Sequence, residues 1–186
     1  MKNIIKTTLA LVIIFALISL VLYHQNQGTS QILPSPSPVA SPLYNDFHLV
    51  IPVLNIEAPV IADVDGNNKK AYNRALEDGV AQLLGSAKPG ESSNIFIFGH
   101  SSNYWWNAGN YKKIFATLPN LNIGDEIDLW YNQKEYKYKV TKLKTVLPDN
   151  INVTDKTSSE QLSLMTCVPI GTDQKRLIVI AKPIEN

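Results

Sequence analysis

The chain has 186 residues, 45% of them hydrophobic, and a formal charge of +1 at pH 7. This length allows about one ordinary domain with appendages. The near-neutral charge argues against a nucleic-acid-binding protein, which would present a strongly basic surface, and the single cysteine excludes an internal disulfide.

An apolar segment, Ile4–Tyr23, lies near the start of the chain and has Lys6 as its only charge. About 20 apolar residues suffice to span a bilayer as a helix. Lys2 and Lys6 lie at its N-terminal end, whereas His24–Asn45 has no Asp, Glu, Lys or Arg, so the charge bias predicts a cytoplasmic N-terminus and an extracellular remainder. We therefore predict that residues 1–23 form a cytoplasmic start and a single-pass transmembrane signal anchor. A cleaved signal peptide is the less favoured alternative, because no small-residue cleavage pair directly follows the apolar run.

Residues 24–43 read as an extracellular linker. Their core, Ser30–Pro42 (SQILPSPSPVASP), is rich in Pro and Ser and is typical of an extended polyproline II stalk. The folded domain is expected over residues 44–186.

From there, short apolar runs alternate with turn residues, and several runs have the period of two that is typical of strands, such as EIDLWY and EYKYKV. The pattern predicts a mainly β domain, either an antiparallel barrel or a sandwich. The predicted strands cover residues 48–56, 58–64, 94–100, 125–131, 134–147, 161–167 and 176–182.

One segment has helical spacing instead. Apolar residues recur at intervals of three and four over Lys69–Gly85, which predicts a helix with Gly79 as a candidate break. Lys112–Leu118 is predicted to form a second short helical turn.

Acidic residues cluster at Asp125, Glu126 and Asp128, which could suggest a metal site. The surrounding sequence NIGDEIDLW reads better as a turn that enters a strand with its polar residues outward. We assign no metal and no cofactor.

The stretch LMTCVPIGTDQKR contains Cys167, the only cysteine. A lone cysteine is commonly just a small buried hydrophobe. Here, however, Cys167 ends one predicted strand and Arg176 begins the next, so a hairpin would bring both to the same end of the sheet. His100 also stands at a strand end, closing the run NIFIFGH. A cationic neighbour lowers the pKa of a thiol and can hold a negatively charged oxygen.

These three residue types suit acyl transfer. A thiolate attacks an amide carbonyl to form a thioester, an acid protonates the departing amine, and a donor stabilises the tetrahedral oxyanion. Cys167, His100 and Arg176 could fill these roles in that order, if the fold brings them together.

At these residues the sequence resembles the sortases, membrane-anchored cysteine transpeptidases of bacterial cell surfaces. The family's T-L-x-T-C strand is similar to SLMTC, with Ser163 in place of the first Thr, and its strand-Gly-His run is similar to IFIFGH. The pattern T-C-x-P-x-G followed by Arg is matched by Thr166, Cys167, Pro169, Gly171 and Arg176.

The resemblance implies an eight-stranded sortase-type β-barrel. It also implies that Cys167 is the nucleophile, that His100 acts as acid and then as base, and that Arg176 supports the oxyanion or the substrate. Thr166 would line the site, and the loop Val146–Gln161 would recognise the substrate. Apolar contacts are expected there from Leu147, Pro148, Ile151 and Val153.

By the same resemblance, the substrates are surface proteins with an LPxTG-like sorting signal, and the acyl group passes to an amine of the cell wall or another amine acceptor. No lid motif lies between His24 and His48, which favours protein anchoring, while pilin polymerisation stays open. Two further alternatives remain. One is a cysteine peptidase that hydrolyses the same intermediate, and the other is a non-catalytic tethered β-domain that binds a wall component.

Overall fold

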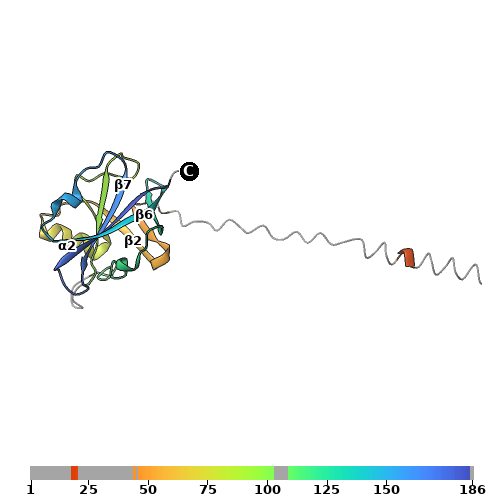
Figure 1. Ribbon diagram of the computed structural model, residues 1–186, viewed down its shortest axis with the longest axis horizontal. Coiled ribbons are helices and arrows are strands. Elements are labelled where there is room, and N and C mark those ends of the chain that lie inside the picture. Colours follow the sequence, from red (N-terminus) through yellow and green to blue (C-terminus); the bar gives the residue numbers. More distant parts are fainter. Residues whose placement is uncertain (1–17, 21–43, 45, 103–108, 185–186) are drawn as a thin grey trace, which may run out of the picture. The chain divides into compact units, whose positions relative to one another are not determined.

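The computed structural model describes residues 18–20, 44, 46–102 and 109–184 (Figure 1). The chain divides into two units, Met1–Ser41 and Pro42–Asn186, and the second contains the fold described below. Most of the predicted anchor and all of the predicted linker up to residue 43 lie outside the described residues. No helix within the described ranges is long and apolar enough to cross a membrane.

Eight strands of the described chain close into a barrel in the order β1-β2-β3-β4-β7-β8-β6-β5, which confirms the mainly β, eight-stranded prediction. Two neighbouring pairs, β2–β3 and β4–β7, are parallel, so the barrel is not purely antiparallel. The strands are β1 (His48–Ile51), β2 (Ile56–Val64), β3 (Val80–Leu83), β4 (Asn94–Phe98), β5 (Glu126–Tyr131), β6 (Lys134–Val146), β7 (Gln161–Val168) and β8 (Lys175–Pro183).

The helix predicted over Lys69–Gly85 is only partly correct. Helix α2 covers Lys69–Asp78, and the Asn68 side chain caps it by accepting a hydrogen bond from the Ala71 amide at 3.1 Å. The helix ends at Gly79, where a Cβ atom would lie 2.2 Å from the Pro59 carbonyl oxygen. Val80, Ala81 and Leu83, which follow, belong instead to β3, which pairs with β2 on one side and β4 on the other.

The second predicted helical turn is also displaced. Residues 112–117 form turns, and the short 3-10 helix η2 covers Leu118–Asn120. Phe115 and Leu118 are fully buried, so this segment lines the barrel core rather than forming a separate helix. Two further 3-10 helices are η1 (Pro52–Leu54) and η3 (Ile151–Thr154).

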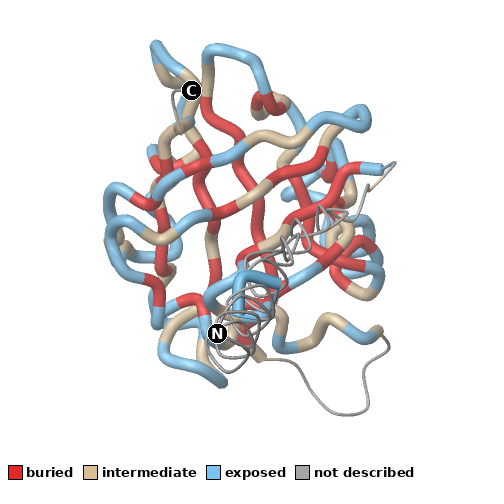
Figure 2. The backbone as a smooth tube through the Cα atoms, turned by 90° about the vertical axis from the view of Figure 1, so that its right-hand side faces the viewer, coloured by how far each residue is buried: buried red, intermediate tan, exposed pale blue. Residues whose placement is uncertain are grey.

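Side-chain alternation along the strands creates two apolar clusters, and the buried strands are visible in Figure 2. The larger cluster fills the barrel and includes Ile95, Ile97, Leu162 and Leu164. Residues at the intervening positions of β4 and β7 point to the opposite face of the sheet. On that outer face the strands form a second cluster with residues of α2 and η3, and it comprises Val64, Ala75, Leu76, Ala81, Phe96, Phe98, Val153 and Ile178.

Candidate active site

The parallel pairing of β4 and β7 brings the predicted histidine and cysteine together. Phe98 pairs with Met165 at the end of the register, and the first amide after β4, that of Gly99, donates to the Met165 carbonyl at 3.1 Å. Continuing the same register places His100 level with Cys167. Both residues therefore leave the sheet at the same end of the barrel, as the strand-end argument predicted.

Buried contacts fix the backbone that carries His100. The Thr166 hydroxyl donates to the Gly99 carbonyl at 3.0 Å, and the Phe115 amide donates to the His100 carbonyl at 3.0 Å. A Cβ atom on Gly99 would lie 2.7 Å from the Phe115 ring, so any side chain there would force the ring or the backbone to shift. The imidazole is therefore attached to a segment held from β7 and from the buried Phe115.

Arg176 lies directly opposite Cys167 in the antiparallel β7–β8 pair. Its Nη1 donates to the carbonyls of Asp173 at 2.8 Å and Lys175 at 3.2 Å, so its own loop orients the guanidinium. The loop is also joined to the segment after His100, because the Gly171 amide donates to the Ser102 hydroxyl at 3.0 Å.

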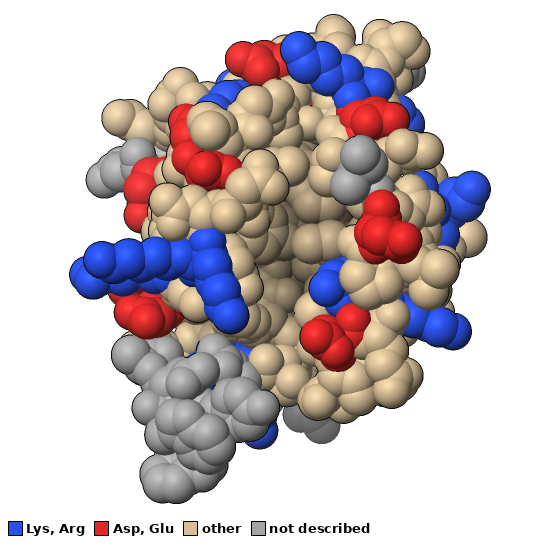
Figure 3. Space-filling model, turned by 90° about the vertical axis from the view of Figure 1, so that its left-hand side faces the viewer, with Lys and Arg blue, Asp and Glu red and all other residues tan. Residues whose placement is uncertain are grey.

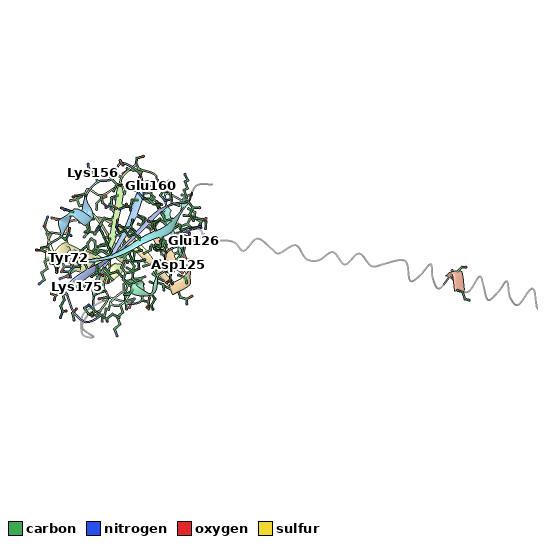
Figure 4. All side chains as sticks on the ribbon, viewed as in Figure 1. Tyr72, Asp125, Glu126, Lys156, Glu160 and Lys175 are labelled. Carbon is green, nitrogen blue, oxygen red and sulfur yellow. The ribbon has the colours of Figure 1, made fainter. Side chains whose placement is uncertain are left out.

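A groove of about 380 Å³ connects these residues. The face that contains α2 is hollowed, with uncharged residues in the hollow and charged side chains along its rims (Figure 3). Tyr72 of α2 lies on this side of the barrel in Figure 4. The groove is lined by Gly66, Tyr72, Leu76, Leu83, Phe96, Phe98, Gly99, His100, Val146, Pro148, Asn150, Val153, Thr154, Met165, Thr166, Cys167 and Arg176.

The electrostatic environment of the groove favours a neutral imidazole. Burial lowers the pKa of His100 from its usual value, since desolvation penalises the charged form. Cys167 is half-buried and is a free thiol. The groove therefore brings a thiol, an imidazole and a guanidinium together in a largely apolar setting.

The predicted substrate-binding residues are distributed unevenly around the groove. Thr166, Pro148 and Val153 line it. Leu147 is 60% exposed and is not among the lining residues. The Ile151 side chain lies outside what the structure describes.

The groove floor and one wall are formed by residues that the sequence did not single out. Phe96, Phe98 and Met165 form the floor, and Tyr72 and Leu76 of α2 form the wall. A signal for the floor was present, because these three residues stand at alternate positions before His100 and Cys167 and must share their face of the sheet. No comparable signal identified the helix as a wall.

The acidic residues considered for a metal site lie elsewhere. Asp125 and Glu126 are on the opposite side of the barrel from Tyr72 in Figure 4. Asp128 lies 3.5 Å from the Lys137 ammonium. Across residues 18–20, 44, 46–102 and 109–184, no group of three or more His, Cys, Asp or Glu residues could hold a metal ion.

Comparisons with known proteins agree with this geometry. The sequence profile of the Sortase domain family matches residues 49–184. Sortase A of Bacillus anthracis is 29% identical over 129 residues, which are 69% of this chain and 55% of that protein. Sortase D of Bacillus subtilis (strain 168) is 29% identical over 140 residues, 73% of this chain and 62% of that protein. The chain thus matches little more than half the length of these relatives.

Solved structures share the fold. Sortase C-1 from Actinomyces oris superposes with a TM-score of 0.63 at 24% identity, over 75% of this chain and 73% of that one, and supports the fold alone. A lid mutant of sortase A from Corynebacterium diphtheriae gives a TM-score of 0.62 at 26% identity, over 80% of this chain and 75% of that one.

Proposed function

The chain belongs to the sortase family, and on this premise we propose that it is a cysteine transpeptidase that joins surface proteins to an amine. Its substrates carry an LPxTG-like sorting signal, and the acceptor is an amine of the cell wall. The observation that carries the proposal is that Cys167, His100 and Arg176 all line one groove.

In the first half-reaction the Cys167 thiolate attacks the carbonyl carbon of the Thr–Gly peptide bond. The negative charge moves to the carbonyl oxygen, where the Arg176 guanidinium stabilises it. Protonated His100 then donates its proton to the Gly nitrogen as the C–N bond breaks. The products are an acyl thioester on Cys167 and a free amine on the departing Gly segment.

In the second half-reaction an acceptor amine attacks the thioester carbonyl, and neutral His100 removes the proton that the amine must lose. Collapse of the tetrahedral intermediate releases the new amide and restores the Cys167 thiolate. Burial of His100 favours its neutral form, which this second step needs. The same burial leaves a smaller fraction of His100 protonated for the first step.

The apolar floor of the groove suits an extended peptide with apolar side chains. Phe96, Phe98 and Met165 run along the outer face of β4 and β7 towards Cys167. Pro148 and Val153 approach from the loop between β6 and β7. We assign the recognition of the sorting signal to this channel, with the scissile carbonyl beside Cys167.

We also propose that residues 1–23 anchor the enzyme in the cytoplasmic membrane, with the catalytic domain outside. The support is the apolar segment Ile4–Tyr23 and the lysines on its N-terminal side. Tethering would concentrate the enzyme near substrates held at the same surface. Protease added to intact cells should digest the domain of residues 44–186, and digestion only after lysis would contradict this orientation.

The test of the activity is mass spectrometry of the purified chain incubated with an LPxTG-type peptide, with and without triglycine. We expect an acyl adduct on Cys167 that triglycine converts into a ligated peptide. The Cys167→Ala variant is the matched control and should form neither product. No adduct from folded, reduced protein across a varied peptide panel would overturn the proposal in favour of a binding domain.

The same experiment separates the remaining alternatives. An adduct that only water releases would favour a hydrolytic peptidase. A pilin-polymerising enzyme would instead prefer a lysine side chain within a folded pilin subunit over triglycine. The fold alone does not exclude this alternative, since Sortase C1 of GBS Pilus Island 1 superposes on this chain with a TM-score of 0.63 at 26% identity, over 75% of this chain and 64% of that one.

A further inference from the structure

A buried amide joins strand β4 to the loop between β6 and β7. Asn94, the first residue of β4, is 2% exposed. Its Nδ2 donates to the carbonyls of Val153 and Asp155, each at 3.2 Å. Val153 lies in η3 and Asp155 directly follows it, so a single side chain attaches this part of the loop to the barrel.

Neighbouring side chains of β7 determine which way the amide points. The Ser163 hydroxyl, 1% exposed, donates to Asn94 Oδ1 at 2.8 Å. Gln161 Nε2 donates to the Ser163 hydroxyl at 3.1 Å and to Asn94 Oδ1 at 3.4 Å. Because carbonyl oxygens can only accept, the Asn94 amide must turn its two N–H groups towards the loop.

The attached loop forms part of the groove. Val153 is 9% exposed, and it lines the groove together with Pro148 and Thr154. The hydrogen-bonded network itself lies away from the reacting atoms, because Ser163 precedes Cys167 by four residues, about 13 Å along a strand. The network can therefore affect where the groove wall lies without contacting the reaction centre.

We propose that Asn94, oriented by Ser163, is a positioning residue that holds the β6–β7 loop against the groove and thereby sets the affinity for the peptide substrate. This inference rests on the proposed function. It also explains why Ser is acceptable where the family pattern has Thr, since the hydroxyl group is the part of the residue that the network uses.

The test compares three variants in the full chain. Asn94→Asp keeps the side-chain shape but turns an oxygen towards two carbonyls, Ser163→Ala removes the orienting donor, and Ser163→Thr keeps it. In Asn94→Asp the carbonyls of Val153 and Asp155 lose their donor, which weakens the contact between the loop and the barrel. We expect KM to rise by about 5-fold to 100-fold. We expect a smaller rise in Ser163→Ala, nearly wild-type values in Ser163→Thr, and kcat within about threefold throughout.

Two independent measurements accompany the kinetics. Hydrogen exchange of the amides from Asn152 to Asp155 should accelerate in Asn94→Asp and Ser163→Ala but not in Ser163→Thr. The rate of Cys167 alkylation by iodoacetamide should stay at the wild-type value, because the network does not reach the thiol. Ser158→Ala, at an exposed serine of the same loop, is the control and should change nothing.

Each outcome decides the proposal. The proposal is overturned if hydrogen exchange of the loop amides is unchanged in both Asn94→Asp and Ser163→Ala. It is also overturned if these variants lower kcat and leave KM unchanged. If Asn94→Asp does not fold, the contrast between Ser163→Ala and Ser163→Thr decides. If the wild type turns over no peptide, the proposed function fails, and the exchange measurements still decide whether Asn94 holds the loop.

Discussion

Cys167 and Arg176 are directly paired residues of the antiparallel β7–β8 ladder, although eight residues separate them in the chain. Opposed residues of an antiparallel pair place their Cβ atoms about 5 Å apart on the same face. The hairpin thus sets a cation beside the thiol through the backbone register. Carbonyls of Asp173 and Lys175 then orient the guanidinium.

Replacing this cation should impair catalysis more than folding. We expect Arg176→Ala to lower kcat/KM for peptide ligation by about 100-fold to 1000-fold, the usual effect of losing one oxyanion donor. Lys175→Ala is the matched control, since its side chain is exposed and points to the other face of β8. Steady-state kinetics measure the effect, and a loss of less than about fivefold in Arg176→Ala would remove the assigned role.

His100 should make stability depend on pH. Burial lowers its folded-state pKa, so below about 6.5 the unfolded chain binds the proton more readily than the folded one. The free energy of unfolding should therefore fall as the pH drops from about 6.5 towards the lowered folded value, and then level off. Urea unfolding of wild type and His100→Asn measures this. If the unfolding free energy depended on pH in the same way in both proteins, burial of His100 would not disfavour its protonated form.

The buried hydroxyl of Thr166 should be needed for stability. Thr166→Val keeps the shape but leaves the Gly99 carbonyl without its 3.0 Å donor, which should cost about 1–3 kcal/mol. Thr166→Ser retains the donor and should lose less. Chemical denaturation of both variants gives the comparison, and a Val variant as stable as the Ser variant would show that the hydrogen bond contributes little.

The close contact between Gly99 and Phe115 should leave too little room for a methyl group at position 99. In Gly99→Ala the new Cβ would lie 2.7 Å from a fully buried ring, and overpacking of this kind costs about 1–3 kcal/mol. Adding Phe115→Leu should restore part of that loss, because it removes the obstructing ring atoms. A double-mutant cycle of unfolding free energies measures the coupling, and additive losses would argue against direct contact.

Much of the fold followed from local patterns. The period-two runs identified most strands, and the strand-end positions of His100, Cys167 and Arg176 anticipated their common groove. Strand β3 was missed because its apolar residues continue the helical spacing of α2. Only its pairing with β2 and β4 in the folded barrel identifies it as a strand. The parallel β4–β7 pair was also missed, since pairing between distant segments leaves no local signature.

The extent of the groove was harder to foresee. Its floor follows from alternation once the register is known, but its helical wall depends on how α2 packs on the outer face of the barrel. The roles of Leu147 and Ile151 stay predictions.

The β4–β7 pair has a further consequence for how the protein acquires activity. It joins segments 67 residues apart, as the Asn94–Gln161 contact illustrates, and contacts of such high sequence separation carry a large chain-closure entropy and limit folding rates. His100 and Cys167 become neighbours only when this pairing forms. A partly folded chain therefore carries the thiol without the imidazole that we propose as its proton carrier, and we expect the onset of peptide ligation during refolding to report closure of the barrel itself.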